Sequence, residues 1–365
     1  MKLEKLLIVD PIKGEFTGDI EIEGEKITKV IPKNYKDYNS IVMPGFVDTH
    51  THAQKGIDTM YASKEDFEHW ANNNFSQGVT SFFPTTVSAS KQQILSVLKN
   101  IENVSTSIEG VHLEGPFINK EKKGAQNPDY IRNPTLEELK EIINDKVKLI
   151  TVAPEIDNFF EVINYLKENN LSISLGHTSG DYKLFEKAFK FGVKRITHFP
   201  NALTPLHHRE IGGTGSGLYF DFIIEMICDG IHLSPEFVKL VYNLKGPDRI
   251  ILVTDSMVAA GLEDGKYELG GLPVIVKNQE ARLENGTIAG STLLFNEAVK
   301  NFKSFTNCSL QELSKVSSYN ALMDLKIFDK GRIEVGYIAN LVMLDRELNV
   351  KETIFQGDEI FATSR

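Results

Sequence analysis

Short apolar runs alternate with segments of helical pattern between residues 44 and 330. This rhythm is expected of parallel strands joined by crossover helices. An uninterrupted apolar run such as IILV, at residues 250–253, suits a strand that is buried on both faces. In chain order, the candidate strands are PGFVDTH, VTSFFPT, IEGVHLEG, VKLITVAPE, LSISLGHT, VKRITHFPN, FIIEMICDG and RIILVTDS, which begin at residues 44, 79, 108, 147, 171, 193, 222 and 249.

The number of these runs predicts the fold class. Eight parallel strands are the number that closes a (β/α)8 barrel, or TIM barrel. Helix-start signals stand between or after the runs, because Thr135 with Glu138 and Ser309 with Glu312 form capping-box pairs. We therefore predict an α/β protein with a (β/α)8 TIM barrel over residues 44–330. An open, doubly wound sheet is the alternative that the pattern alone leaves open.

Both ends of the chain read as short strands. Strand patterns broken by glycine turns cover residues 6–30 and 333–361. Two β-rich ends that flank a barrel can pair with each other, so we predict a small, discontinuous β-sandwich domain from residues 1–43 and 331–365. A further β insertion is predicted near residues 267–288, where Gly-Gly and Asn-Gly turn signals occur.

The composition changes this picture little. The 365 residues carry 40 Lys and Arg against 50 Asp and Glu, a net charge of −10. These values are ordinary for a globular protein, and nothing in them indicates nucleic-acid or membrane binding. The apolar run in MKLEKLLIVDP is too short for a signal peptide, and no stretch approaches the roughly 18 apolar residues of a membrane span. With Cys228 and Cys308 as the only cysteines, we predict a cytoplasmic protein with buried, unpaired thiols.

Side chains of metal-ligand type stand where several of these runs end. In a closed barrel the working residues lie at the carboxyl ends of the strands, so such side chains are expected to converge at one mouth of the barrel. They are His50 and His52 after the first run, Glu114 after the third, His177 after the fifth, His198 after the sixth and Asp255 after the eighth.

The types and spacing of these side chains predict a divalent metal, zinc or iron, with one or two ions per chain. His50 and His52 are two residues apart, so in an extended segment both point the same way and can reach one ion. A bound metal lowers the pKa of water from 15.7 toward about 7, and Asp255 is placed to take and return the proton. Taken alone, a His-x-His pair is common outside metal sites, and Asp255 could instead cap a helix. The coincidence of five ligand-type residues at strand ends favours the metal site.

A second polar cluster follows the sixth run and suits an anionic ligand. The sequence THFPNALTPLHHREIGGTGSGL contains Arg209, whose guanidinium could hold a phosphate or carboxylate with two hydrogen bonds. Backbone amides around Asn201 and Ala202 could support the same anion. The alternative is a solvated loop with an ordinary surface arginine.

Ordered motifs cover nearly the whole chain. They are PGFVDTHTH, HLEGPF with KKGAQNP after it, LGHTSG, THFPNALTP, CDGIHL, LVTDS and GTIAGST. In this combination the chain resembles the amidohydrolase superfamily and, within it, the N-acetylglucosamine-6-phosphate deacetylases. The likeness extends from VDPIKGEFTGDIEIEGEKI through KGRIEVGYIANLVMLD.

The resemblance implies hydrolysis of N-acetyl-D-glucosamine 6-phosphate to D-glucosamine 6-phosphate and acetate. It implies Glu114, His177 and His198 as ligands of the principal metal, usually zinc or iron, and Asp255 as the general base and acid. It also implies a homodimer in which the partner chain helps to complete the phosphate site. The residues that it implies for the sugar-phosphate pocket are Ala125, Gln126, Asn201, Ala202, Arg209, Asp229, His232, Ala289 and Gly290.

Two positions depart from the pattern of that family. Gln126 stands where the pattern generally has a histidine that helps to polarise the substrate carbonyl, and its amide can donate a hydrogen bond but cannot become a cation. Ala53 stands where the first-strand motif usually continues with glycine. Gln126 leaves two alternatives open: a deacylase of another N-acyl amino-sugar phosphate, such as N-acetylgalactosamine 6-phosphate, or a weakly active sugar-phosphate-binding protein.

Overall fold

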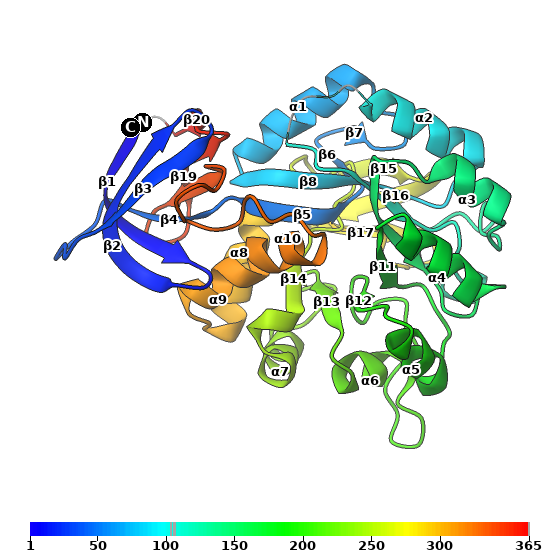
Figure 1. Ribbon diagram of the computed structural model, residues 1–365. Helices are drawn as coiled ribbons and strands as arrows, with labels where there is room; N and C mark the ends of the chain where they lie inside the picture. Colours follow the sequence, from blue (N-terminus) through cyan, green and yellow to red (C-terminus); the bar gives the residue numbers. More distant parts are fainter. Residues whose placement is uncertain (103, 105–106, 364–365) are drawn as a thin grey trace.

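Eight parallel strands form the centre of the molecule in the computed structural model, which describes residues 1–102, 104 and 107–363 (Figure 1). They pair in chain order within one sheet, and the backbone N–H of Asp255, beyond the last strand, donates to the carbonyl of His50 in the first (2.8 Å). The predicted (β/α)8 fold is confirmed, and the open-sheet alternative is wrong. The strands are β5 (Phe46–Thr51), β8 (Val79–Thr86), β9 (Val111–Glu114), β10 (Val147–Val152), β11 (Ser172–Leu175), β12 (Arg195–Ile196), β13 (Ile223–Met226) and β14 (Ile250–Leu252).

A helix follows each barrel strand. The eight helices are α1 (Lys64–Phe75), α2 (Lys91–Ile101), α3 (Leu136–Ile142), α4 (Phe159–Glu168), α5 (Tyr182–Lys190), α6 (Gly212–Tyr219), α7 (Pro235–Lys245) and α8 (Phe295–Thr306). The chain then adds α9 (Leu310–Ser314), a π-helical turn (Lys315–Tyr319) and α10 (Asn320–Asp324), and short 3-10 turns lie at Lys120–Lys122 and Pro247–Arg249. Among the described residues, no helix is both long and apolar enough to cross a bilayer.

The two predicted capping boxes have different outcomes. Ser309 and Glu312 form the complete box at the start of α9. At α3 the Thr135 hydroxyl accepts from the backbone N–H of Glu138, but the return bond of the box is not made. The Glu138 carboxylate instead accepts from Nε of Arg132 (3.2 Å), and a charged donor is a stronger partner than a backbone amide.

Both ends of the chain meet in a seven-stranded sheet beside the barrel, at the left of Figure 1. β4 joins the two ends, because it runs parallel to β1 and antiparallel to β18. A small core of its own, which includes Ile8, Ile20 and Leu341, lies against the sheet. The boundaries predicted at 43/44 and 330/331 stay a prediction. The strands, in spatial order, are β20 (Asp358–Ala362), β19 (Val350–Phe355), β18 (Leu341–Leu344), β4 (Ser40–Pro44), β1 (Lys2–Asp10), β2 (Gly14–Glu23) and β3 (Lys26–Pro32).

Two smaller sheets lie near the carboxyl mouth of the barrel. β6 (Ala53–Gln54) and β7 (Ile57–Asp58) form a short hairpin, while β15 (Gly265–Leu269), β16 (Leu272–Lys277) and β17 (Glu280–Leu283) form an antiparallel sheet. Alternate apolar residues of the antiparallel sheet pack in one cluster with Val87 and Met257. The sheet is therefore fixed to loops that follow barrel strands.

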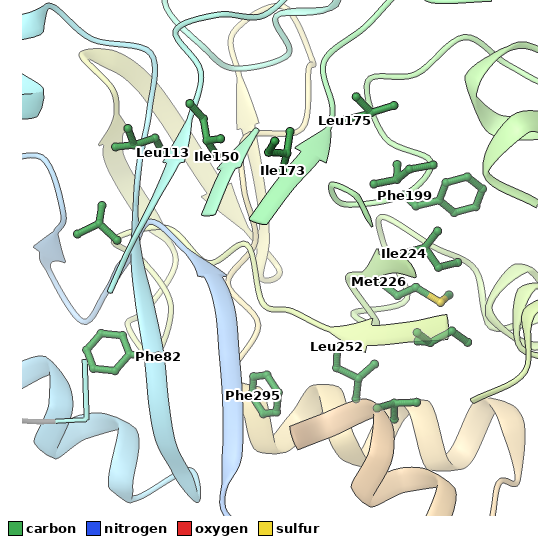
Figure 2. Packing of buried hydrophobic residues seen from close by; sticks show 14 of the residues in the cluster. Phe82, Leu113, Ile150, Ile173, Leu175, Phe199, Ile224, Met226, Leu252 and Phe295 are labelled. Carbon is green, nitrogen blue, oxygen red and sulfur yellow. The ribbon is translucent and has the colours of Figure 1, made fainter. Parts of the chain in front are cut away.

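Apolar and polar residues alternate along most of the barrel strands. Leu113, Ile150, Ile173, Ile224 and their neighbours belong to the large cluster that joins strands and helices (Figure 2). The residues between them point into the barrel, and several are polar: Thr151 Oγ1 lies 2.7 Å from Thr197 Oγ1, which donates to Ser174 Oγ (2.6 Å). The sequence predicted strands that are apolar on both faces. Only some of the barrel strands are, because the inward faces of the others carry polar residues. Cys228 and Cys308 are free and buried, as predicted.

Candidate metal centre and active site

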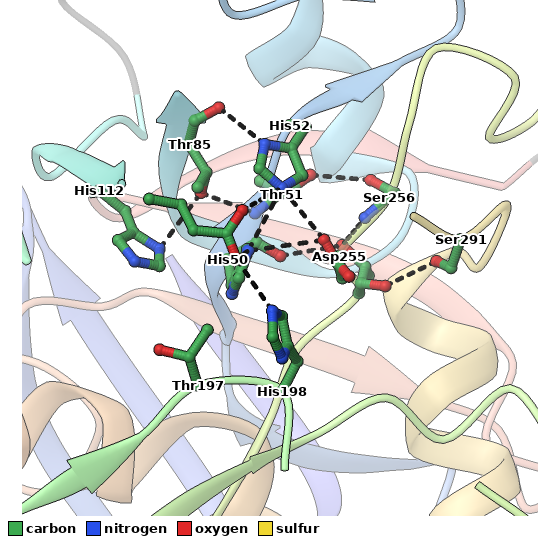
Figure 3. Close-up of polar contacts among 12 residues, drawn as sticks. His50, Thr51, His52, Thr85, His112, Thr197, His198, Asp255, Ser256 and Ser291 are labelled. Atoms are coloured by element: carbon green, nitrogen blue, oxygen red, sulfur yellow. Dashed lines mark hydrogen bonds and ion pairs between the residues drawn. The ribbon is translucent and has the colours of Figure 1, made fainter. Parts of the chain in front are cut away.

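Two groups of buried side chains meet at the carboxyl mouth of the barrel. His50, His52 and Asp255 form one group, and Glu114, His177 and His198 form the other. Within each group the candidate ligand atoms all lie within 4.8 Å of one another. Figure 3 shows His50 and His52, at the end of β5, pointing toward His198 and Asp255, which follow β12 and β14. The structure thus brings together every side chain that the sequence assigned to the metal.

Glu114 links the two groups. Its Oε1 lies 2.9 Å from Nε2 of His198 and 3.1 Å from Nε2 of His177. Its Oε2 lies 3.2 Å from Nε2 of His52. One carboxylate therefore faces both groups and is placed to contact two neighbouring ions.

The spacing of the donor atoms fits divalent cations. Two ligands of one tetrahedral ion, each about 2.0–2.2 Å from it, stand roughly 3.3–3.5 Å apart. Nε2 of His50 lies 3.4 Å from Nε2 of His52 and 3.5 Å from Oδ1 of Asp255, within this range, while the Nε2 atoms of His177 and His198 lie slightly closer, at 3.0 Å. Imidazole nitrogens and carboxylate oxygens without a cysteine are the donor set of a hydrolytic zinc or iron centre.

Hydrogen bonds on the far side of the rings orient the imidazoles. Nδ1 of His52 lies 3.1 Å from the carbonyl oxygen of Thr85, and Nδ1 of His177 lies 2.7 Å from that of Lys122. A carbonyl oxygen only accepts, so each Nδ1 carries a proton, and Nε2 is the nitrogen that faces the centre and can ligate an ion. His198 differs, since within the described residues its Nδ1 has no partner.

Three of the strand-end residues adopt a backbone conformation that is rare outside glycine. The φ angles are 47° at His177, 28° at His198 and 50° at Asp255. Residues of this kind cost energy in the left-handed region and persist where the surrounding structure holds them. Asp255 is held on both sides, because its N–H donates to His50 and its carbonyl accepts from the N–H of Ser291 (both 2.8 Å). No helix starts after Asp255, where turns lead to β15, so the capping alternative is wrong.

The charges of the cluster favour a cation. Burial raises the pKa of Glu114, but the neighbouring His50 and His177 outweigh burial and hold it well below the ordinary value. Burial likewise lowers the pKa of His52, but Asp255 and Glu114 bring it well above its ordinary value. The centre therefore holds ionised carboxylates that attract positive charge, whether protons or metal ions.

A cavity of about 350 Å³ opens over this centre. Of the nine residues implied for the sugar-phosphate pocket, six line it: Ala125, Gln126, Asn201, Ala202, His232 and Gly290. Asp229 lies behind the cavity wall, with Oδ2 2.6 Å from Nδ1 of His232, and Ala289 is buried beside Gly290. Arg209 is not brought to the cavity of its own chain: it lies on an exposed loop, where its Nη1 donates to Nε2 of His208 (2.8 Å).

Gln126 is fixed between a backbone amide and the metal centre. Its Oε1 accepts from the N–H of Ser88 and its Nε2 donates to Oε2 of Glu114, both at 2.5 Å. The Ser88 bond sets the orientation of the amide, since an N–H can only be met by oxygen. One hydrogen of Nε2 thus binds Glu114, and the other is the one that a ligand in the cavity can accept.

Sequence reasoning missed several residues around the cavity. Val87, Lys122, Leu269 and Ile288 line it, of which Leu269 and Ile288 come from the predicted β insertion. Lys122 belonged to the motif KKGAQNP, whose basic residues were a usable signal. The apolar residues of the insertion carried no such signal, because their position depends on how the small sheet docks.

Asp48, at the base of the centre, predicts a pH dependence of stability. Burial raises its pKa from 3.8 to about 7, so between these values the folded protein holds a proton that the unfolded chain has lost. Stability is therefore lost as the pH rises through this window. In chelator-treated protein, Asp48→Asn should gain stability over the parent, and the gain should be about 3 kcal/mol larger at pH 8 than at pH 5. Urea unfolding of parent and variant at both pH values measures this gain in unfolding free energy. A gain that does not change with pH would contradict the raised pKa of Asp48.

The mouth of a (β/α)8 barrel that carries imidazoles, carboxylates and an adjacent cavity defines a class of protein, the metal-dependent hydrolases. The model of the amidohydrolase family matches residues 41–360. The chain belongs to the amidohydrolase family and groups there with the N-acetylglucosamine-6-phosphate deacetylases.

Relatives and solved structures support this grouping. The N-acetylglucosamine-6-phosphate deacetylase of Bacillus subtilis (strain 168) is 39% identical over 337 residues, which cover 88% of this chain and 85% of the relative. The crystal structure of the Thermotoga maritima enzyme of the same name is 52% identical, with a TM-score of 0.96 over 100% of both chains. A mutant of the Mycobacterium smegmatis enzyme, in complex with N-acetyl-D-glucosamine-6-phosphate, is 26% identical, with a TM-score of 0.93 over 99% of both chains.

Proposed function

We propose that this protein hydrolyses the N-acetyl group of N-acetyl-D-glucosamine 6-phosphate to give D-glucosamine 6-phosphate and acetate. The observation that carries the proposal is the convergence of Asp255 with five metal-ligand side chains beneath a cavity of about 350 Å³, in a chain 52% identical to a deacetylase of this name. Such a cavity lies in the size range of small-molecule sites.

Different residues of the chain would bind the metal, transfer the proton and hydrogen-bond the substrate carbonyl. Glu114, His177 and His198 would hold the principal ion, and His50 and His52 a second. A bound divalent ion would polarise the amide carbonyl and lower the pKa of water. Asp255 accepts a proton from the attacking water and delivers it to the nitrogen of the leaving amine, so the C–N bond breaks as the acid forms. Gln126 offers the free hydrogen of its Nε2 to the carbonyl oxygen.

An acetate-release assay tests the proposal. Protein loaded with zinc, and separately with iron, is given N-acetyl-D-glucosamine 6-phosphate, its galacto epimer and the sugar without phosphate. We expect acetate release to be fastest with the gluco phosphate and to stop after treatment with a chelator. No acetate release from any of the three compounds in either metal form would remove the proposed function.

The alternatives raised by Gln126 are not favoured. A relative 39% identical and a solved structure 52% identical to this chain are N-acetylglucosamine-6-phosphate deacetylases, and the centre keeps every ligand together with Asp255. The galacto compound would have to be hydrolysed faster for the first alternative to hold. The second alternative, a weakly active binding protein, would require turnover to appear only in Gln126→His.

We further propose a homodimer in which Arg209 serves the cavity of the partner subunit. Arg209, Leu206 and Tyr219 are exposed on or near the loop that leaves the cavity after Ala202, and Leu206 and Tyr219 are 54% and 70% exposed. Exposed apolar side chains of this kind beside a polar site are typical of an interface. Arg209→Ala should raise KM by about ten-fold or more, the effect of losing one charge-assisted contact, with kcat less affected. Light scattering of the parent measures its oligomeric state, and a monomeric parent would contradict the homodimer. A KM in Arg209→Ala equal to that of the parent would contradict the role of Arg209 in the cavity.

We propose zinc or iron as the bound metal and the cytoplasm as the cellular compartment of this protein. Imidazole and carboxylate donors suit zinc or iron, between which availability often decides, and metal analysis of protein purified without added metal identifies the ion. Free, buried cysteines suit a reducing compartment, so we propose that the protein works in the cytoplasm.

A further inference from the structure

We propose that Glu225 is a positioning residue that, held by Arg195, fixes the ring of His50 so that its Nε2 faces a second metal ion. The inference rests on the metal site of the proposed function. Glu225 stands in the middle of β13 and Arg195 at the start of β12, one layer below the metal centre inside the barrel. Both side chains are fully buried.

Glu225 uses both of its carboxylate oxygens. Oε2 lies 2.9 Å from Nδ1 of His50 and accepts from the backbone N–H of His198 (3.1 Å). Oε1 accepts from Nε of Arg195 (2.8 Å). The carboxylate therefore touches one residue of each ligand group and a buried cation at the same time.

Arg195 holds this carboxylate in place. Its Nη1 donates to Oδ2 of Asp324 (2.8 Å), and its Nη2 donates to the hydroxyl of Thr49. A fully buried guanidinium with two carboxylates and a hydroxyl is held in one geometry, because each donor lost would leave an unpaired buried group. Such a cluster lies too deep to contact a ligand in the cavity.

His50 is the imidazole whose orientation this cluster decides. His52 and His177 are set by backbone carbonyls, whereas His50 is set by the Glu225 carboxylate. Both oxygens of Glu225 already accept, Oε2 from the backbone N–H of His198 and Oε1 from Arg195, so the carboxylate is the acceptor toward His50 as well. Nδ1 of His50 therefore carries a proton, and its Nε2 faces His52 and Asp255. A carboxylate behind a ligating histidine also raises its basicity, and removing such a partner typically costs 10- to 100-fold in metal affinity.

Glu225→Gln is the decisive variant. Its amide keeps one oxygen, which Arg195 requires, so the NH2 group turns toward His50 and the backbone N–H of His198. His198 loses that backbone bond, but its Nε2 keeps its contacts with Glu114 and His177. Nδ1 of His50 must then accept, and the proton moves to Nε2, where it blocks an ion. We expect the affinity for the second ion to fall about 10- to 100-fold while the ion at Glu114, His177 and His198 stays bound. Competition titration with a chromophoric chelator and anomalous diffraction at the zinc edge report each ion separately.

Asp324→Asn is the matched control. It removes the other carboxylate of Arg195 but leaves the contact between Glu225 and His50. We expect this variant to keep both ions with parent affinity. Equal loss of the second ion from both variants, or no loss from Glu225→Gln, would overturn the proposal.

Two further measurements keep the test decisive if Glu225→Gln does not fold. The double variant Arg195→Met/Glu225→Gln removes the buried cation together with its partner and should show the same selective loss. In the zinc-loaded parent, long-range 1H–15N spectra should show Nδ1 of His50 protonated, with the signal identified by its absence from His50→Asn. A protonated Nε2 of His50, or a parent that binds one ion only, would overturn the inference.

Acetate release by the parent tests the proposed function separately. A parent that binds one ion and releases acetate would keep the proposed function and lose only this inference.

Discussion

Asp255→Asn is expected to lower kcat about 10²- to 10⁴-fold, the usual contribution of a general acid-base residue. Asparagine keeps the size of the side chain and an oxygen that can face His52, but it cannot accept a proton from water or return one to the leaving amine. Burial alone raises the pKa of Asp255, yet His50 and His52 hold it below the ordinary carboxyl value, so the parent side chain is ionised and ready to act as a base at neutral pH.

The measurement pairs initial rates of acetate release with metal analysis of the same samples. The ion at Glu114, His177 and His198 should remain in Asp255→Asn, because none of these ligands has changed. Asp58→Asn is the control, since Asp58 is also a buried carboxylate near the mouth of the barrel but its Oδ1 accepts from the backbone N–H of Met60. Parent-like kcat in Asp255→Asn would remove this residue from its assigned role.

The barrel could be predicted because each of its strands has a recognisable pattern in its own short stretch of sequence. Each of the eight runs pairs an apolar stretch with a polar end, and all eight pair in chain order in the structure. Their lengths could not be predicted: the run that begins at residue 193 contains only the two-residue strand Arg195–Ile196. The chain turns soon afterwards, with His198 in the left-handed region. The hydrophobic pattern therefore indicates which segments form strands, but not the residue at which each strand ends.

The metal centre could be predicted for a similar reason, since strand ends of a closed barrel meet by topology. Glu225 and Arg195 were missed, although Glu225 carries the one charge in the apolar run FIIEMI and Arg195 stands beside Lys194 in the strand segment VKRIT. A charge at such a position is costly unless it is paired. Sequence alone does not say which partner neutralises it, because β12 and β13 become neighbours only in the fold.

The location of Arg209 relative to the cavity could not be predicted from strand order. The loop that carries this arginine follows Asn201 and Ala202 directly, and its basic residues suited an anion, yet Arg209 is exposed and does not line the cavity of its own chain. In the proposed homodimer the contacts between subunits would follow from surface shape, which neither periodicity nor strand order encodes. The lining supplied by Leu269 and Ile288 depends in the same way on docking of the small sheet.

Glu114→Gln should have the broadest effect of any single change in the centre. Oε1 of Glu114 serves the group of His177 and His198, while Oε2 serves His52, so a neutral side chain at this position weakens both groups at once. We expect both ions to be lost on dialysis and kcat/KM to fall about 10³-fold or more, which corresponds to the several kcal/mol that a bound ion contributes. Metal analysis after dialysis and the acetate-release assay measure the two effects.

The contrast with two other variants makes this prediction specific. Asp255→Asn should lose activity with the principal ion still bound, and Glu225→Gln should lose the second ion selectively, whereas Glu114→Gln should lose both. Glu109→Gln is the control, because Glu109 lies before the start of β9, at the opposite end from Glu114, and binds Lys330 (2.7 Å). Retention of one full equivalent of metal by Glu114→Gln would mean that the two groups bind their ions independently, and the shared role of this carboxylate would be wrong.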